Sequence, residues 1–271
     1  MSAASPSAHD AIAANGGRAP DGGTAADDAG ATGAGVASAA PALAVEGIEQ
    51  YHGSSHTLRD VSLGIERGCT VLMGRNGVGK TTLLQCVVGL LPIRAGRVAL
   101  RGEDITALAP ERRAAAGVGY VPQGRQIFPR LTVEENLRVG LRARRDGRRE
   151  VPEEIHDLFP MLADMRRRRG GDLSGGQQQQ LAIGRALATG PDVLLLDEPT
   201  EGIQPNVVAE IGEVIGRLHR ELGLAVLIVE QKLPFARRIG DRFALMDRGA
   251  IVAEGSMDTL GEDLVGRYLT V

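Results

Sequence analysis

The sequence predicts an α/β fold built on a mainly parallel sheet, with an antiparallel β subdomain and a helical subdomain added to it. Two runs of consecutive apolar residues, Val193–Leu196 and Ala225–Val229, are typical of strands buried on both faces of a parallel sheet. Between them, apolar residues recur at the spacing of one helix face, which predicts an amphipathic crossover helix. These residues are Val208, Ile211, Ile215, Leu218 and Leu222. A strand, a helix and a strand in this order indicate an α/β core.

Shorter β-rich runs come earlier, separated by Gly and charged turns. They are Leu43–Val45, Thr57–Leu63, Val71–Met73, Arg97–Leu100 and Val118–Val121. Thr132 and Glu135 form a capping-box pattern that opens a helix, which we expect to run to about Arg145. A second helix is expected at Pro152–Phe159. Because residues 124–172 hold no strand candidate, we interpret them as a helical subdomain.

The composition divides the chain into a tail and a folded part. Residues 1–41 are rich in Ala, Gly, Ser, Asp and Pro, so we expect a disordered low-complexity tail. Residues 42–271 are expected to form one domain. The net charge of −3 gives no basic excess of the kind that marks nucleic-acid binders, so we expect no nucleic-acid partner. No apolar run approaches the roughly 20 residues that span a bilayer, and membrane contact is expected only through partner subunits.

A glycine-rich loop follows the strand at Val71–Met73 and matches G-x-x-x-x-G-K-[ST] in full. Its glycines let backbone N–H groups turn toward phosphate oxygens, and the next helix, Thr81–Val88, adds a partial positive charge. Lys80 can reach the β- and γ-phosphates, and the Thr81 hydroxyl can ligate Mg²⁺. The sequence therefore predicts a P-loop NTPase with a RecA-like core. The expected nucleotide contacts in this loop and helix are Gly74, Arg75, Asn76, Gly77, Val78, Gly79, Lys80, Thr81 and Thr82.

Two carboxylates follow the apolar run at Val193–Leu196. Asp197 is placed at the carboxyl end of a central strand, where α/β sheets bind ligands, and we expect it to hold Mg²⁺. Glu198 is then positioned to act as a general base on the attacking water, a role worth about 10²–10⁴-fold in rate.

A second anion-binding helix start lies upstream of Asp197. The stretch Leu173–Gln179 (LSGGQQQ) resembles the signature sequence of ABC ATPases. A helix is expected at Gln177–Leu187, and its amino-terminal end suits an anion. Because the chain already has a phosphate loop, we expect this end to contact the γ-phosphate of a partner chain's ATP. The residues assigned to this contact are Ser174, Gly175, Gly176 and Gln177.

The resemblance to ABC transporter ATP-binding subunits covers the chain from Leu43 to Val271. It implies that Tyr51 stacks on adenine and that Gln123 ligates Mg²⁺ and links the core to the helical subdomain. The helical subdomain resembles the one that receives coupling helices of the membrane subunits. At two positions the sequence departs from the family pattern. Gln231 stands where the family has a histidine that contacts the γ-phosphate, and Gln204 replaces the usual aspartate. We assign Gln231 to the catalytic set with Glu198.

Further motifs resemble the ATPases of branched-chain amino acid and urea importers. Gln123–Pro129 (QGRQIFP) and the Glu-Gln pair at 230–231 carry the first resemblance. Glu201–Pro205, Val229–Arg238 and Tyr268–Val271 look most like the smaller urea-importer ATPase. The resemblance implies ATP and Mg²⁺ as ligands and a place at the cytoplasmic face of the bacterial inner membrane.

The implied partners are a second ABC ATPase in a head-to-tail dimer, two permeases and an extracytoplasmic substrate-binding protein. A branched-chain amino acid importer is the alternative. A soluble ABC ATPase acting on ribosomes or DNA fits less well, because such proteins usually carry two cassettes or long coiled-coil inserts.

Overall fold

The computed structural model describes residues 40–270, so the expected tail at 1–41 lies outside the described residues except for Ala40 and Pro41. Residues 40–270 form two sheets with helices around them, and the α/β fold with a P-loop core is confirmed. The central sheet has the order β10-β9-β3-β8-β7-β6. Its strands are β3 (Gly68–Met73), β6 (Val118–Val121), β7 (Val193–Asp197), β8 (Ala225–Val229), β9 (Arg242–Asp247) and β10 (Ala250–Ser256).

The strands of the central sheet are parallel except for β10, which pairs with β9 in antiparallel fashion. Their side chains alternate between two cores, as the period of two requires. Leu194 and Leu196 of β7 point into one core, whereas Val193 and Leu195 point into the other. This double burial explains why β7 and β8 are continuous apolar runs.

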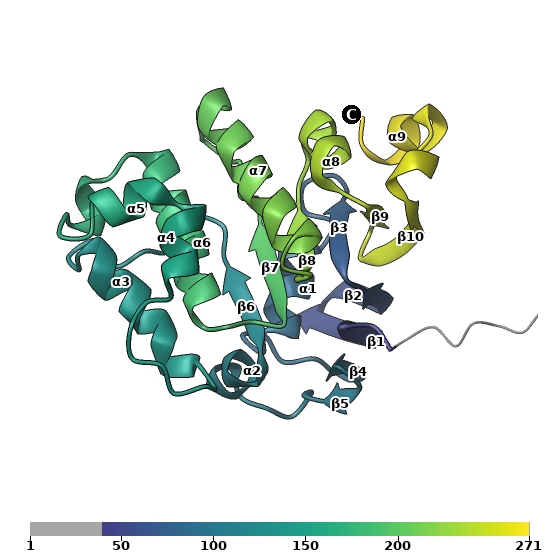
Figure 1. Cartoon of the computed structure of the whole chain (residues 1–271). Coiled ribbons are helices and arrows are strands. Elements are labelled where there is room, and N and C mark those ends of the chain that lie inside the picture. The colour runs from purple at the N-terminus through teal and green to yellow at the C-terminus, as the bar shows by residue number, and fades with distance from the viewer. Residues whose placement is uncertain (1–39, 271) are drawn as a thin grey trace, which may run out of the picture. The chain divides into compact units, whose positions relative to one another are not determined.

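The first core lies between the central sheet and most of the helices. It is filled from α6 (Gly175–Ala188), α7 (Pro205–Arg220), α8 (Leu233–Ile239) and α9 (Glu262–Tyr268). Figure 1 shows α7 and α8 in front of the central strands, with α1 (Lys80–Val87) behind them. The second core joins α1 to a four-stranded sheet of order β2-β1-β4-β5. That sheet consists of β1 (Leu43–His52), β2 (Ser55–Ile65), β4 (Ala95–Leu100) and β5 (Glu103–Asp104).

The helical subdomain gathers to one side of the central sheet (Figure 1). Its helices within 124–172 are α3 (Val133–Gly140), α4 (Glu153–Leu158) and α5 (Pro160–Asp164), with 3₁₀ turns at Leu141–Ala143 and Gly170–Asp172. The capping box at Thr132 and Glu135 forms as expected. The expected continuation to about Arg145 is wrong, because α3 ends at Gly140. A Cβ on Gly140 would come within 2.3 Å of the Arg185 carbonyl oxygen, so α3 meets α6 here and the chain turns away.

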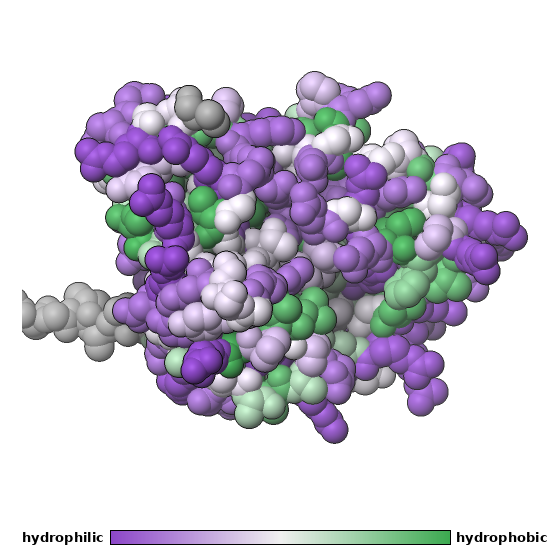
Figure 2. Space-filling view, turned by 180° about the vertical axis from the view of Figure 1, so that it is seen from behind, coloured by the Kyte–Doolittle hydropathy of each residue, from purple (hydrophilic) through white to green (hydrophobic). Residues whose placement is uncertain are grey.

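Helix α2 (Pro110–Ala116) lies before the helical subdomain in the sequence and leads into β6. Among the described helices, none combines the length and apolar character that a bilayer crossing requires. Figure 2 shows the opposite face of the molecule, on which apolar residues form separate small patches among hydrophilic ones.

Candidate nucleotide-binding and hydrolysis site

The phosphate loop lies between β3 and α1, where the sequence places it. Gly79 has a φ of +114°, and a Cβ at this position would lie 2.9 Å from Leu58 Cδ2, so a side chain here would be both strained and crowded. The loop opens into a cavity of about 370 Å³. The lining residues are Thr57, Asn76, Gly77, Gly79, Lys80, Thr81, Thr82, Gln123, Glu198, Glu201 and Gln231.

Lys80 folds back on the loop that precedes it. Its Nζ donates to the carbonyl oxygens of Gly74 and Arg75 at 2.7 and 2.8 Å, and the side chain is buried. Burial lowers the pKa of Lys80, and the charges of Glu198 and Asp197 oppose this shift. The Arg75 guanidinium points elsewhere and donates to the carbonyl oxygens of Arg267 and Thr270 near the C-terminus. The Arg75 side chain therefore points away from the phosphate loop, and only the backbone of this residue contacts Lys80.

The donors expected to hold a divalent cation meet at the foot of the loop. The Thr81 hydroxyl donates to Asp197 Oδ1 at 3.1 Å, and Gln123 lines the same cavity. Asp197 is fully buried, and its Oδ2 finds no hydrogen-bond partner within residues 40–270. An unpaired buried carboxylate oxygen is costly, and hard cations prefer such oxygen ligands. Thr81 and Asp197 therefore fit a Mg²⁺ ion, and the role of Gln123 as a further ligand stays a prediction.

Burial raises the pKa of the Asp197 carboxyl to about 6. The hydrogen bond from Thr81 opposes the rise, while the neighbouring charge of Glu198 adds to it. No three His, Cys, Asp or Glu side chains gather as a metal-binding group in the described part of the chain.

Two glutamine amides hold the carboxylate of Glu198. Gln231 Nε2 donates to Glu198 Oε1, and Gln123 Nε2 donates to Glu198 Oε2 at 3.3 Å. Glu198 itself has a φ of +47°, which is uncommon for a residue with a side chain and often marks a functional position. The structure thus brings together both residues of the predicted catalytic set, from the ends of β7 and β8.

A partly buried network of hydrogen bonds fixes the turn that carries Glu198. The Glu201 N–H donates to the Glu198 carbonyl oxygen at 3.1 Å and closes the turn. The buried Thr200 hydroxyl donates to Glu230 Oε2 at 2.7 Å. Lys232 Nζ donates to the Thr200 carbonyl oxygen at 2.9 Å. The turn is therefore tied to the end of β8, which also carries Gln231.

The signature residues lie at the start of α6, away from the cavity lining given above. Ser174 caps the helix: its hydroxyl accepts from the Gln177 N–H at 3.3 Å, and Gln177 Oε1 accepts from the Ser174 N–H at 2.9 Å. Gly175 and Gly176 form the first turn, so the helix begins two residues before the expected Gln177. A Cβ on Gly176 would lie 2.6 Å from Val207 of α7, and this close approach requires glycine.

Tyr51 lies on the hairpin between β1 and β2. Its ring stacks on His56 with centroids 4.3 Å apart and an angle of 6° between the ring planes. The Arg94 guanidinium lies 5.4 Å from the Tyr51 centroid. In this hairpin, Thr57 lines the phosphate cavity and Tyr51 does not. Adenine stacking on Tyr51 therefore stays a prediction, and a base would have to share the ring with these neighbours.

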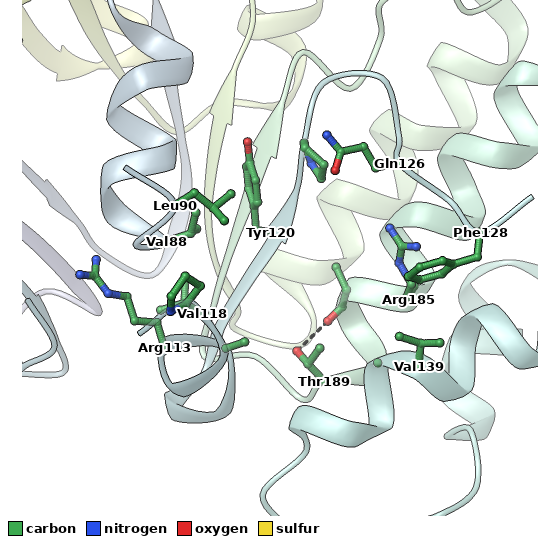
Figure 3. A pocket seen from close by; sticks show the side chains of 15 residues that line it. Val88, Leu90, Arg113, Val118, Tyr120, Gln126, Phe128, Val139, Arg185 and Thr189 are labelled. Atoms are coloured by element: carbon green, nitrogen blue, oxygen red, sulfur yellow. Dashed lines mark hydrogen bonds between the residues drawn. The ribbon is translucent and has the colours of Figure 1, made fainter. Parts of the chain in front are cut away.

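A second cavity, of about 380 Å³, lies between the core and the helical subdomain (Figure 3). Figure 3 shows Phe128 beside Arg185 on one side, Val88 and Leu90 on the other, and Tyr120 between them. The Arg185 guanidinium carbon lies 5.1 Å from the Phe128 centroid. Leu90 is 56% exposed and Phe128 is 45% exposed, so the groove presents apolar surface to solvent.

Comparison with known proteins agrees with this geometry. The family model described as ABC transporter matches residues 58–201, just over half of the 271 residues. The chain belongs to the ABC transporter family. The high-affinity branched-chain amino acid transport ATP-binding protein BraG of Pseudomonas aeruginosa is 39% identical over 78% of this chain and 91% of its own. The probable branched-chain amino acid transport ATP-binding protein LivF of Archaeoglobus fulgidus is 38% identical over 76% and 89%.

A solved nucleotide-free ATP-binding cassette from an ABC transporter has the same fold, with a TM-score of 0.70. It is 30% identical and covers 84% of this chain and 94% of its own. The chain is thus an ABC transporter ATPase subunit, as the signature-like stretch Leu173–Gln179 predicted for a chain with this phosphate loop. Sequence reasoning missed Glu201, although it follows β7 at the same sheet edge where Gln123 follows β6.

Proposed function

We propose that this ABC ATPase hydrolyses MgATP as one half of a head-to-tail dimer and drives an importer from the cytoplasmic face of the membrane. One observation carries the metal assignment: the buried Asp197 carboxylate accepts from the Thr81 hydroxyl through Oδ1, and its Oδ2 has no hydrogen-bond partner among residues 40–270. Mg²⁺ bound there supplies positive charge to the phosphate oxygens of ATP. Thr81, Asp197 and Gln123 are the protein ligands in this proposal.

Lys80, Glu198 and Gln231 have separate roles in the proposed hydrolysis. Lys80 exchanges its two loop carbonyl contacts for phosphate oxygens when ATP enters. Glu198 accepts a proton from the attacking water, and its two amide contacts leave lone pairs for this, since a carboxylate has about four lone-pair sites. Gln231 keeps Glu198 oriented through its amide, which cannot itself carry a proton charge.

The second ATPase of the dimer supplies the signature helix. Ser174 and the first turn of α6 are capped within their own helix and lie outside the phosphate cavity of their own chain. In the head-to-tail arrangement this turn faces the γ-phosphate bound to the partner. Isolated chains should then hydrolyse ATP slowly, because each holds only half of a composite site.

Two variants test the dimer and the phosphate loop. Glu198→Gln should accumulate as an ATP-bound dimer, measured by size-exclusion chromatography with light scattering. Lys80→Ala should lose binding of a fluorescent ATP analogue. A matched control is Glu213→Ala on the exposed side of α7, which should behave as wild type. Wild-type turnover by Glu198→Gln would refute the general-base assignment.

The permeases of the importer are proposed to dock on the apolar groove between core and helical subdomain (Figure 3). Arg185 Nη1 is buried there without a hydrogen-bond partner among the described residues. Phe128→Glu should release the chain from membranes that contain the permeases. It should leave nucleotide binding intact, because the groove does not share its lining with the phosphate cavity.

The cargo proposed is urea, on the resemblance of Glu201–Pro205, Val229–Arg238 and the C-terminal Tyr268–Val271. Branched-chain amino acids are the second candidate, and the names of two relatives, BraG and LivF, favour them. The ATPase does not contact cargo, so a transport assay decides. A strain without this gene should lose uptake of labelled urea and keep uptake of labelled leucine. The reverse result would assign the amino acid importer.

A further inference from the structure

Glu201 is the second acidic side chain in the lining of the phosphate cavity, beside Glu198, and the roles given so far do not use it. Its Oε2 accepts from Gln123 Nε2 at 2.9 Å, which is shorter than the 3.3 Å contact of the same nitrogen with Glu198. A glutamine amide has one oxygen that accepts and one NH₂ group that donates. Because Nε2 donates to two carboxylates, Oε1 is the half of the Gln123 amide that can serve as a ligand.

We propose that Glu201 is a positioning residue that fixes the orientation of the Gln123 amide. This inference rests on the proposed role of Gln123 as a Mg²⁺ ligand. An amide ligates a cation through its oxygen, and a carboxylate that binds the NH₂ group prevents the flipped orientation. Such partners of ligand side chains typically change metal affinity by about 10–100-fold when they are removed.

The position of Glu201 is well defined by its surroundings. It closes the turn that begins at Glu198, and the residue before it, Thr200, is buried and bonded to Glu230. Gln123 follows β6, and this turn follows β7, the strand paired with β6 in parallel. The two side chains therefore meet across one sheet edge, where parallel strands end side by side.

Glu201 also gives the Gln123 NH₂ group an acceptor other than Glu198. Without Glu201, the Gln123 NH₂ group would have Glu198 as its remaining carboxylate acceptor in this set of contacts. The amide would then compete with the attacking water for Glu198 Oε2. With Glu201 present, Gln123 can leave Glu198 and keep its shorter hydrogen bond.

The test measures metal binding and does not depend on hydrolysis. Mn²⁺ replaces Mg²⁺, a non-hydrolysable ATP analogue is present, and free Mn²⁺ is followed by electron paramagnetic resonance. Glu201→Ala should weaken Mn²⁺ binding about tenfold. Glu201→Gln keeps an oxygen acceptor without the charge and should stay within about threefold of wild type. Glu213→Ala is the control for loss of an exposed acidic residue.

A double-mutant cycle with Gln123 separates positioning from simple loss of charge. In the Gln123→Ala background, Glu201→Ala should have no further effect on Mn²⁺ binding, because the amide is gone. An equal loss in both backgrounds would overturn the inference, since an effect of charge alone does not need Gln123. A wild-type affinity for Glu201→Ala, with a loss for Gln123→Ala, would also overturn it. If Gln123→Ala itself binds Mn²⁺ as wild type does, the proposed metal site fails first.

Discussion

The buried carboxyl of Asp197 makes a quantitative prediction about the stability of the metal-free protein. Its pKa rises from an ordinary 3.8 to about 6, because burial disfavours the charged form. Because of this rise, ionising the carboxyl in both states lowers the free energy of unfolding by about 3 kcal/mol relative to the fully protonated protein. Since the folded-state pKa is the higher one, this stability is fully present below pH 3.8 and is lost as pH rises through about 6.

Asp197→Asn removes this titration and keeps the size of the side chain. The buried amide nitrogen of the variant has its own cost, but that cost does not depend on pH. The wild type should therefore lose about 2 kcal/mol relative to the variant between pH 4.5 and 7.5. Titrating groups elsewhere are common to both proteins and cancel in the difference.

The assay is urea denaturation followed by far-ultraviolet circular dichroism, with EDTA present and without nucleotide. Mg²⁺ with a non-hydrolysable ATP analogue should reverse the effect in the wild type at pH 7.5, because a cation favours the charged carboxylate. A difference between the two proteins that stays constant with pH would refute the account of Asp197. So would a wild type that gains stability relative to the variant as pH rises.

Three further substitutions test packing and capping. The buried Arg113 donates to four carbonyl oxygens at the end of α1 and before α2, so Arg113→Met should cost about 3 kcal/mol or more in urea denaturation. Gly176→Ala should lower the melting temperature, because its Cβ would strike Val207 and separate α6 from α7. Gln204 starts α7 without a side-chain cap, so Gln204→Asp should stabilise the protein by about 1 kcal/mol in the same assay.

The sequence predicted best the elements that are buried on both sides. β7 and β8 appear as continuous apolar runs because each face meets a core, and β8 has the bounds that were expected. β10 alternates between half-buried and exposed residues, and α8 and α9 have seven residues each. Such short or edge elements have too few apolar residues to show a helix or strand periodicity in the sequence. Their structure depends instead on how they pack against the central sheet.

The site was predictable where its residues belong to a motif and not where it depends on turn geometry. Lys80, Thr81 and Asp197 could be placed together because the loop and the strand end fix their positions. Glu201 lies in a polar turn without any periodic signal. Only the closure of that turn onto Glu198, 3.1 Å from N to O, directs its side chain back to Gln123.

The replacement of histidine by glutamine at position 231 has a consequence for the pH dependence of hydrolysis. Gln231 donates to Glu198 Oε1 and does not titrate, so this contact is the same at pH 6 and pH 8. Gln231→His would introduce a group with an ordinary pKa of about 6.5. Below that pH the imidazolium would pair with Glu198 and make it a poorer base. We therefore expect kcat of the assembled transporter to fall more steeply in the variant than in the wild type as pH drops from 8 to 6.

The measurement is the ATPase rate at saturating MgATP across this range, with Glu213→Ala as the control. Variant and wild-type profiles of the same shape would mean that residue 231 no longer contacts Glu198 during turnover. The orientation of the general base would then rest on Gln123 and the turn at residues 198–201, because those are the other groups that hold it in the structure.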